Sequence, residues 1–205
     1  LALYAKQGHK IFIAVATNGN VGSPTLSKNE ISDIRKSECE ESCKLLGAKL
    51  IWMNFDDEWL YDTVDSRLVF IDAIRESQAD IVFIHNKNDY HPDHRNASKI
   101  AEDAKIPVSV RLVKTQFDFM ENIPHMFYMD SIGGFSFEPE YYVDISNTME
   151  LKTKMLQCHK SQNDWLMELY NDTPTNMMKT QCKFRGMIPG FKYAEGFKQV
   201  LTYPL

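Results

Sequence analysis

Two imidazoles and a carboxylate stand close together in the sequence His91-Pro92-Asp93-His94. The apolar run Ile81–Ile84 precedes them and is typical of a buried parallel strand, and a helix is predicted to follow over Arg95–Ala104. Neutral imidazole and carboxylate are ligands that suit zinc and related divalent metals. Because open α/β sheets bind ligands at the carboxyl ends of their strands, we expect metal-assisted chemistry at this turn. The alternative is a polar turn in which Asp93 caps the helix and His94 is solvated.

Polar loops are predicted after two earlier strands as well. Asn18-Gly19-Asn20-Val21-Gly22 follows the apolar segment Lys10–Thr17, and Asp56-Asp57-Glu58 follows Lys49–Asn54. Glycine and asparagine permit the positive φ angles that close approach to a ligand often requires. Each loop alone is equally well explained as an ordinary strand-to-helix connection or a charged surface loop. If the strands are parallel, the three polar segments should converge on one edge of the sheet.

Helices are predicted between these strands, over Ser27–Leu46 and Val64–Ser77. The resulting β-α-β-α-β-α order predicts an α/β fold, with a mostly parallel sheet covered by helices on both faces. The remaining predicted elements are strands at Pro107–Thr115, His125–Met129 and Tyr141–Asp144, helices at Met149–Cys158, Asp164–Tyr170 and Tyr193–Leu201, and a loop or lid at Met177–Ile188.

The helix predicted over Ser27–Leu46 has clear end signals. Ser27 and Glu30 match a capping box, and Gly47 is a typical helix stop. Its predicted buried stripe consists of Ile31, Ile34, Cys39, Ser42, Leu45 and Leu46. Arg35 and Glu38 lie one turn apart, and a solvated ion pair is the simplest interpretation of their spacing.

The composition predicts a single globular domain over residues 1–205, since 43% hydrophobic and 25% charged residues are ordinary values. A net charge of −5 gives no reason to expect nucleic acid or an anionic membrane as a partner. No apolar run approaches the length of a membrane span. The four cysteines lack Cys-x-x-Cys spacing and suit reduced thiols in a cytoplasmic protein. A homo-oligomer is left open.

The order of these motifs resembles the PIG-L (LmbE-like) family of zinc-dependent de-N-acetylases over nearly the whole chain. The matching pieces are Thr17-Asn18-Gly19-x-x-Gly22, Arg35-x-x-Glu38, Leu46-Gly47, Phe55-x-Asp57-x-x-Leu60, His91-Pro92-Asp93-His94, Val143-Asp144-Ile145-Ser146, His159-x-Ser161-Gln162 and Tyr193-Ala194-Glu195-x-Phe197. The resemblance implies a Rossmann-like, mostly parallel sheet flanked by helices, with the active site at the carboxyl ends of the strands. It also implies an N-deacetylase that uses Zn²⁺, or another divalent transition metal, on a small acetylated amino sugar of the N-acetylglucosamine type.

The resemblance further implies roles for individual residues. His94 would be a metal ligand in a site of two histidines and one carboxylate, with an open position for water. His91 would stabilise the oxyanion or protonate the leaving amine, and Asp93 would orient His91 and favour its charged form. The implied substrate contacts are Arg35, Asp57 and Asn18.

One part of the resemblance lies outside the sequence. The family's first strand ends in a His-Pro-Asp-Asp-Glu turn, which supplies the other metal ligands and the general base. We expect these residues before Leu1, because Leu1–Gly8 reads as the last turns of a helix.

Two other functions stay open at this point. One is a catalytically inactive carbohydrate-binding protein of the same fold. The other is a nucleotide-binding α/β domain, which is disfavoured because no phosphate-binding fingerprint follows the first strand. Other polar residues receive lesser roles: packing for His159, Gln162, Tyr193 and Glu195, a gate at Asp89 and Tyr90, and no functional role for His9, His85 and His125.

Overall fold

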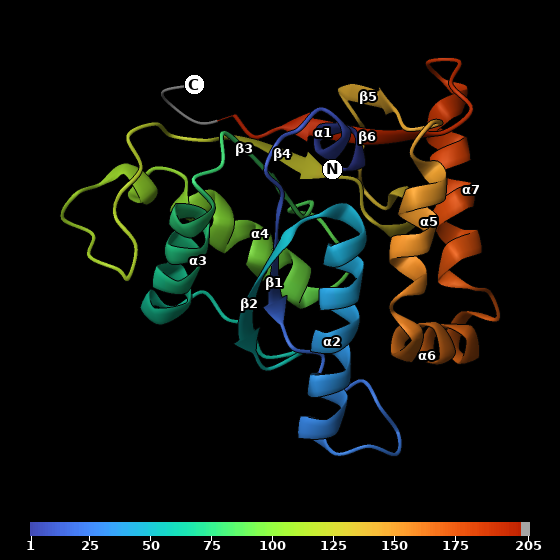
Figure 1. Ribbon diagram of the computed structural model, residues 1–205, viewed down its shortest axis with the longest axis horizontal. Coiled ribbons are helices and arrows are strands. Elements are labelled where there is room, and N and C mark those ends of the chain that lie inside the picture. The colour runs from blue at the N-terminus through green and yellow to red at the C-terminus, as the bar shows by residue number, and fades with distance from the viewer. Residues whose placement is uncertain (202–205) are drawn as a thin grey trace. The chain divides into compact units, whose positions relative to one another are not determined.

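The computed structural model describes residues 1–201, apart from the side chains of residues 164, 165 and 168–170 (Figure 1). The chain forms two compact units. The first unit comprises Leu1–Asp57 and Tyr142–Glu195, and the second comprises Glu58–Tyr141 and Gly196–Leu205. The chain passes from one unit to the other after Asp57, within β5 (Tyr141–Asp144) and within β6 (Ala194–Gln199). The expectation of a single domain over residues 1–205 stays a prediction.

The first unit begins with a β-α-β arrangement. After the short helix α1 (Ala2–Lys6), strand β1 (Phe12–Thr17) pairs in parallel with β2 (Lys49–Phe55), and α2 (Lys28–Leu46) connects them. Figure 1 shows α2 running alongside these strands. The predicted capping box at Ser27 is present, and Gly47 ends α2 at φ 69°, where a residue with a Cβ would be strained. These predictions are confirmed.

The buried face of α2 differs from the predicted stripe. Ile34 and Leu45 are exposed (40% and 48%), whereas Arg35 and Glu38 are buried. The buried residues of α2 are Ile31, Arg35, Glu38, Ser42, Cys43 and Leu46. The prediction placed the stripe on the apolar residues, but two charged side chains are accepted on this face because each has polar partners there.

The first unit also contains three helices from the C-terminal part of the chain, α5 (Met149–Gln157), α6 (Lys160–Tyr170) and α7 (Pro174–Met187). The predicted loop at Met177–Ile188 is therefore wrong. Thr173 accepts a hydrogen bond from the backbone N–H of Asn176, and Pro174 occupies the first turn, so the start of α7 carries ordinary helix signals. Cys182 of α7 packs with Ile145 and Met149 in a buried cluster, and Figure 1 shows α5 and α7 side by side.

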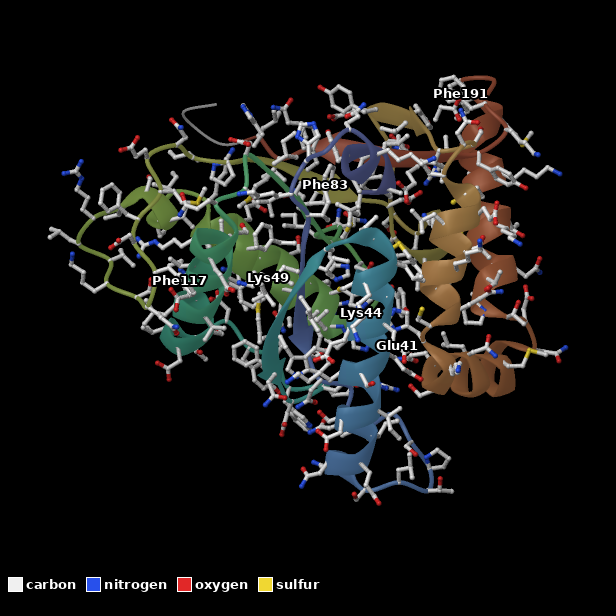
Figure 2. All side chains as sticks on the ribbon, viewed as in Figure 1. Glu41, Lys44, Lys49, Phe83, Phe117 and Phe191 are labelled. Carbon is white, nitrogen blue, oxygen red and sulfur yellow. The ribbon has the colours of Figure 1, made fainter. Side chains whose placement is uncertain are left out.

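The second unit contains α3 (Val64–Ser77), β3 (Ile81–Ile84), α4 (Pro92–Ala104) and β4 (His125–Met129). Strand β3 pairs in parallel with β4, and β4 pairs antiparallel with the end of β6. Phe83 of β3, labelled in Figure 2, lies 6.0 Å from Phe127 and 5.0 Å from Phe197 between ring centroids. The predicted helix at Tyr193–Leu201 is wrong, because pairing with β4 across a long sequence separation makes this segment a strand.

The predicted strand at Pro107–Thr115 is also wrong. A short 3₁₀ helix, η1 (Pro107–Ser109), and irregular turns replace it. Arg75, which is 2% exposed, explains the difference. Its guanidinium donates hydrogen bonds to the carbonyls of Val108 (3.0 Å), Val110 (3.0 Å) and Val113 (2.8 Å). Backbone acceptors that a strand would use for a neighbouring strand are thus used by one buried side chain.

The class predicted from the sequence is confirmed: this is a mixed α/β structure whose sheets contain parallel pairs and are flanked by helices. Within residues 1–201, no helix has both the length and the apolar character that crossing a membrane requires.

Candidate active site

The turn between β3 and α4 contains most of the candidate chemistry in the second unit. Helix α4 begins at Pro92, three residues earlier than predicted, and His91 is its N-cap. His91 Nδ1 accepts a hydrogen bond from the backbone N–H of Asp93 at 3.2 Å, so this imidazole takes the place of a Ser or Asp cap. The alternative in which Asp93 caps the helix is therefore wrong.

Three side chains of this turn form a compact cluster of donors. The ligand atoms of His85, Asp89 and His94 all lie within 4.8 Å of one another. Asp89 is 4% exposed, and its Oδ1 lies 3.0 Å from His94 Nδ1. The His85 ring stacks on the His94 ring, with centroids 4.3 Å apart and planes 2° apart. We call these three residues the His–Asp–His cluster.

The cluster has the donor chemistry of a transition-metal site. Ligand atoms on one zinc ion lie at most about 4.4 Å apart, because Zn–N and Zn–O bonds are about 2.0–2.2 Å long. The ligand atoms of the cluster lie within 4.8 Å of one another, which is somewhat wider than this limit, so one shared ion requires the side chains to move closer together. A second arrangement needs only His94: the Asp89 carboxylate accepts from Nδ1–H, which fixes the tautomer and leaves Nε2 as the ligand atom. The second arrangement is available as the side chains stand, whereas the first requires the stacked His85 and His94 rings to turn, and His94 takes part in each.

Burial and the nearby imidazoles keep His85 neutral. Burial is the largest cause, followed by the charge of His94, and together they lower the pKa of His85 to about 4. The Asp89 carboxylate opposes this shift. A neutral imidazole is the form that binds metals, so His85 is in the ligand form at neutral pH.

The carboxylate that faces His91 is not the predicted one. Asp93 is 4% exposed, and its two oxygens accept hydrogen bonds from the backbone N–H groups of Glu58 (2.7 Å) and Leu60 (3.2 Å). His91 Nε2 lies instead 3.1 Å from Glu58 Oε1. Asp93 therefore fixes the Glu58–Leu60 loop, and Glu58 makes the side-chain contact that was expected of Asp93.

In the first unit, the loops after β1 and β2 are joined by a polar network. Asn20 Nδ2 donates to Asp56 Oδ1 at 2.8 Å, and Asn20 Oδ1 accepts from the backbone N–H of Asp57 at 3.2 Å. Thr17 Oγ1 donates to Asp57 Oδ1 at 3.1 Å, and Asn18 Nδ2 donates to Asn54 Oδ1 at 3.3 Å. The expected convergence of the Asn18 and Asp57 loops thus occurs within this unit.

Arg35 of α2 packs against the same loops. Its Nη2 donates to the carbonyl of Gly22 at 3.1 Å, and its Nη1 lies 4.0 Å from Asp57 Oδ2. A Cβ on Gly19 would stand 2.0 Å from Arg35 Nη1, and a Cβ on Gly22 would stand 2.1 Å from Nη2. The two glycines of the Asn18–Gly22 loop are therefore needed to make room for the guanidinium.

The interpretation of Arg35 and Glu38 as a solvated surface pair is wrong. Both side chains are buried, and Glu38 accepts hydrogen bonds from the backbone N–H (2.8 Å) and the hydroxyl (2.7 Å) of Ser161. With its amide oxygen turned toward Arg35, Gln162 accepts from Nη1 and Nη2 at 3.3 Å. Arg35 Nε is buried without a hydrogen-bond partner among the described residues. Ser161 and Gln162, in the first turn of α6, thus bind Glu38 and Arg35 of α2 and hold the two side chains in place.

Two other residues expected to serve packing have local partners in the first unit. Glu195 forms an ion pair with Lys152 of α5. The backbone N–H of Tyr193 donates to Ser146 Oγ at 3.2 Å. These contacts fit the structural role that was expected of both residues.

A cavity of about 560 Å³ lies in the second unit beside the turn. Its walls include Asn86, Lys87 and Asn88, which follow His85 directly in the chain, and Tyr128 and Lys198 from β4 and β6. Asn86 donates hydrogen bonds to the carbonyls of Phe135 and Ser136, which hold the opposite wall. The cavity is mainly polar and large enough for a sugar ring.

The structure brings the predicted site residues together within each unit: His91, Asp93 and His94 in the second, and Asn18, Arg35 and Asp57 in the first. Sequence reasoning gave no role to His85, only a gate to Asp89, and no separate role to Glu58. The spacing His85-x-x-x-Asp89-x-x-x-x-His94 after a buried strand was the available signal for the cluster. The contact of Glu58 with His91 had no local signal.

The fold and this polar turn define an α/β protein with a histidine–carboxylate cluster at a strand end. The profile of the family described as PIG-L, GlcNAc-PI de-N-acetylase, matches residues 1–105, and the chain belongs to this family.

Individual relatives have two kinds of activity in their names. The chain is 27% identical over 202 residues to diacetylchitobiose deacetylase from Thermococcus kodakarensis, covering 94% of this chain and 73% of the relative. It is 23% identical over 179 residues to 4-oxalmesaconate hydratase from Pseudomonas putida, covering 83% and 69%. The crystal structure of N,N′-diacetylchitobiose deacetylase from Pyrococcus horikoshii superposes with a TM-score of 0.82 at 26% identity, covering 97% of this chain and 76% of that one.

Proposed function

We propose that the protein is a metal-dependent hydrolase that removes the acetyl group from an N-acetylglucosamine-type sugar or glycoside. The observation that carries the proposal is the buried Asp89 carboxylate on His94 Nδ1, next to the His91 imidazole, in a chain of the PIG-L family. The diacetylchitobiose deacetylases among the relatives support the substrate class.

The metal would be held by His94 through Nε2, with Asp89 fixing the ring from Nδ1. His85, neutral and stacked on His94, is the next donor that this chain offers. When bound, zinc or a similar ion lowers the pKa of its water toward neutrality and polarises the amide carbonyl.

His91 is the proposed acid of the reaction. Because its Nδ1 accepts from the helix backbone, Nε2 is the nitrogen that can present a hydrogen to a substrate. From there it can donate a hydrogen bond to the developing oxyanion. Giving a proton to the leaving amine requires the imidazolium, in which Nδ1 also carries a hydrogen and no longer accepts from the Asp93 N–H. Asp93 acts indirectly in this proposal, because it holds the backbone of the loop that carries Glu58.

Substrate recognition is assigned to Arg35, Asp57 and Asn18. Sugar hydroxyls and anionic substituents suit a guanidinium with fixed donor geometry and a carboxylate that accepts hydrogen bonds. The unpartnered Nε of Arg35 and the 21% exposure of the Asp57 side chain are consistent with this assignment. The cavity beside Asn86–Asn88 is the candidate place for a second sugar or another substituent.

The direct experiment measures acetate and free amine released from N,N′-diacetylchitobiose and N-acetylglucosamine by the full-length protein, with zinc and after chelation. We expect equal amounts of both products, and their loss on chelation.

The same assay contains two informative negative results. Saturable sugar binding without acetate release would favour the inactive carbohydrate-binding protein. Hydration of 4-oxalmesaconate without deacetylation would favour the activity named for the hydratase relative.

A further inference from the structure

Glu58 has a backbone conformation that its side chain makes unfavourable. Its φ angle is +70°, in the left-handed region, where a Cβ comes too close to the neighbouring carbonyl. Glycine adopts this conformation without strain. A strained residue that glycine could replace is an indication that its side chain has a use.

The surrounding structure holds Glu58 in this conformation. The buried Asp93 carboxylate accepts from the backbone N–H of Glu58 at 2.7 Å and from that of Leu60 at 3.2 Å. Leu60 is 1% exposed, so its side chain anchors the far end of the loop in the core of the second unit. The loop geometry is therefore fixed by groups other than the Glu58 side chain.

The Glu58 side chain is directed at one nitrogen of His91. Oε1 lies 3.1 Å from Nε2, while Nδ1 of the same ring accepts from the backbone N–H of Asp93 at 3.2 Å. Since a neutral imidazole has one donor and one acceptor nitrogen, the acceptor role of Nδ1 places the hydrogen on Nε2. The Nε2–H group then donates to the Glu58 carboxylate, and both ring nitrogens are held.

We propose that Glu58 is a positioning residue for His91: before substrate binds, its carboxylate accepts from Nε2–H and so fixes the imidazole plane and tautomer, and the substrate oxygen then replaces the carboxylate as the acceptor. The inference rests on the proposed function for its catalytic consequence. The contact between Glu58 and His91 is independent of the proposed function. With Nδ1 alone held, the ring could turn about that single hydrogen bond, and a misplaced donor loses much of its effect in the transition state.

The test compares Glu58→Gly with Glu58→Gln in the full-length, metal-loaded protein. Glycine removes the side chain and relieves the backbone, so we expect an unchanged or higher melting temperature together with about a tenfold lower kcat and a KM within about twofold of wild type. Glutamine keeps an oxygen acceptor for Nε2–H, so Glu58→Gln should retain most of kcat.

The matched control is Gln78→Gly, since Gln78 also has a positive φ (49°) and ends α3. It should relieve the backbone in the same way, with the loss of the hydrogen bond from Gln78 Nε2 to the Arg75 carbonyl, and should leave kcat unchanged.

A second readout does not depend on activity. In proton–nitrogen NMR spectra of the zinc-loaded protein, the hydrogen on His91 Nε2 should be visible in wild type and Glu58→Gln, and should exchange with water too fast to be seen in Glu58→Gly. Loss of this signal with no deacetylase activity in wild type would overturn the proposed function but retain the contact. Wild-type kcat and a persistent signal in Glu58→Gly would overturn the positioning role, as would equal kcat losses in the glycine and glutamine variants.

Discussion

The two polar regions of this protein differ in the kinds of side chains they contain and in how these are paired. In the turn of the second unit, imidazoles and carboxylates lie next to one another, and the ligand atoms of His85, Asp89 and His94 are within 4.8 Å of one another. In the loops of the first unit, amides and carboxylates are paired with one another, and a guanidinium fills the space between them. The turn of the second unit is suited to binding a cation and to proton transfer, and the loops of the first unit form a fixed surface of hydrogen-bonding groups.

Glycine and proline have different structural roles in the two regions. Gly19 and Gly22 are needed because Arg35 occupies the volume that their side chains would fill. Pro92 stands at the first position of α4, where its missing N–H is not needed and its fixed φ suits the helix, and the N–H of the next residue, Asp93, binds His91 Nδ1. The glycines thus leave space for the Arg35 guanidinium in the first unit, and the proline fixes the backbone beside the His91 ring in the second.

The largest expected effect separates the two histidines of the turn. His94→Ala should remove most of the bound zinc. It should therefore lower kcat/KM by at least about 10³-fold, because the metal supplies the activated water. His91→Ala should retain the zinc and lower kcat by about 10²–10³-fold, the usual contribution of a donor to the developing oxyanion. Zinc content by atomic emission and acetate release measure both quantities.

Two results would contradict these roles of His91 and His94. Equal loss of zinc in the two variants would mean that His91 is also a ligand. Unchanged zinc in His94→Ala would remove the cation from the turn.

The next effect tests whether the loops of the first unit recognise substrate. Arg35→Ala should lower kcat/KM by about 10- to 150-fold, the loss expected for a charge-assisted hydrogen bond of about 1.5–3 kcal/mol. Gly22→Ala should have a similar effect, because the new Cβ would displace the guanidinium. Zinc content should be normal in both variants, unlike in His94→Ala.

A double variant provides the control for this prediction. If Gly22 acts only by seating Arg35, Gly22→Ala should have little further effect on kcat/KM in the Arg35→Ala background. Additive losses would mean that the glycine has a separate function.

A smaller effect is expected on folding from Asp93. Asp93→Ala leaves the N–H groups of Glu58 and Leu60 without their acceptor and should lower the free energy of unfolding by about 2–4 kcal/mol. Asp93→Asn keeps one acceptor oxygen and should lose about half as much. Urea unfolding measures both. A loss of kcat with wild-type stability would instead favour the direct role in orienting His91 that the sequence resemblance implied.

Much of the fold was predictable where the signals are local. The capping box at Ser27, the stop at Gly47 and the apolar runs of β1, β2 and β3 determine their own elements. The failures are at segments decided by distant partners. Val108–Val113 is bound by Arg75, and the end of β6 becomes a strand because β4 pairs with it. No pattern within either segment contains that information.

The candidate site divides in the same way. His91 and His94 were found from their residue types and their place after a strand. The partners of these rings were not, because Glu58 reaches His91 from a loop 33 residues earlier, and His85 depends on the geometry of the turn. Burial reversed the interpretation of Arg35 and Glu38, since spacing along a helix does not say which face is covered.

The smallest expected effect is a pH dependence of folding in the first unit. Burial lowers the pKa of His159, and the carboxylate of Glu38 opposes this shift only in part. The unfolded chain takes up a proton near the ordinary pKa of about 6.5, whereas the folded chain stays neutral to lower pH. Below about pH 6.5 the unfolded state therefore binds more protons, and stability must fall as the pH falls until the folded pKa is reached.

Replacing the imidazole removes this linkage. His159→Gln should have a flatter dependence of melting temperature on pH below about pH 6.5 than wild type has. The difference between the two proteins should be the same with and without a chelator, because His159 lies in the first unit and not in the metal-binding turn of the second. Identical slopes in both proteins would show that His159 is as accessible to protons in the folded chain as in the unfolded one. A difference that disappears on chelation would mean that the stability of the first unit depends on metal bound in the second. Substrate recognition in the first unit and metal binding in the second could then no longer be treated as separate.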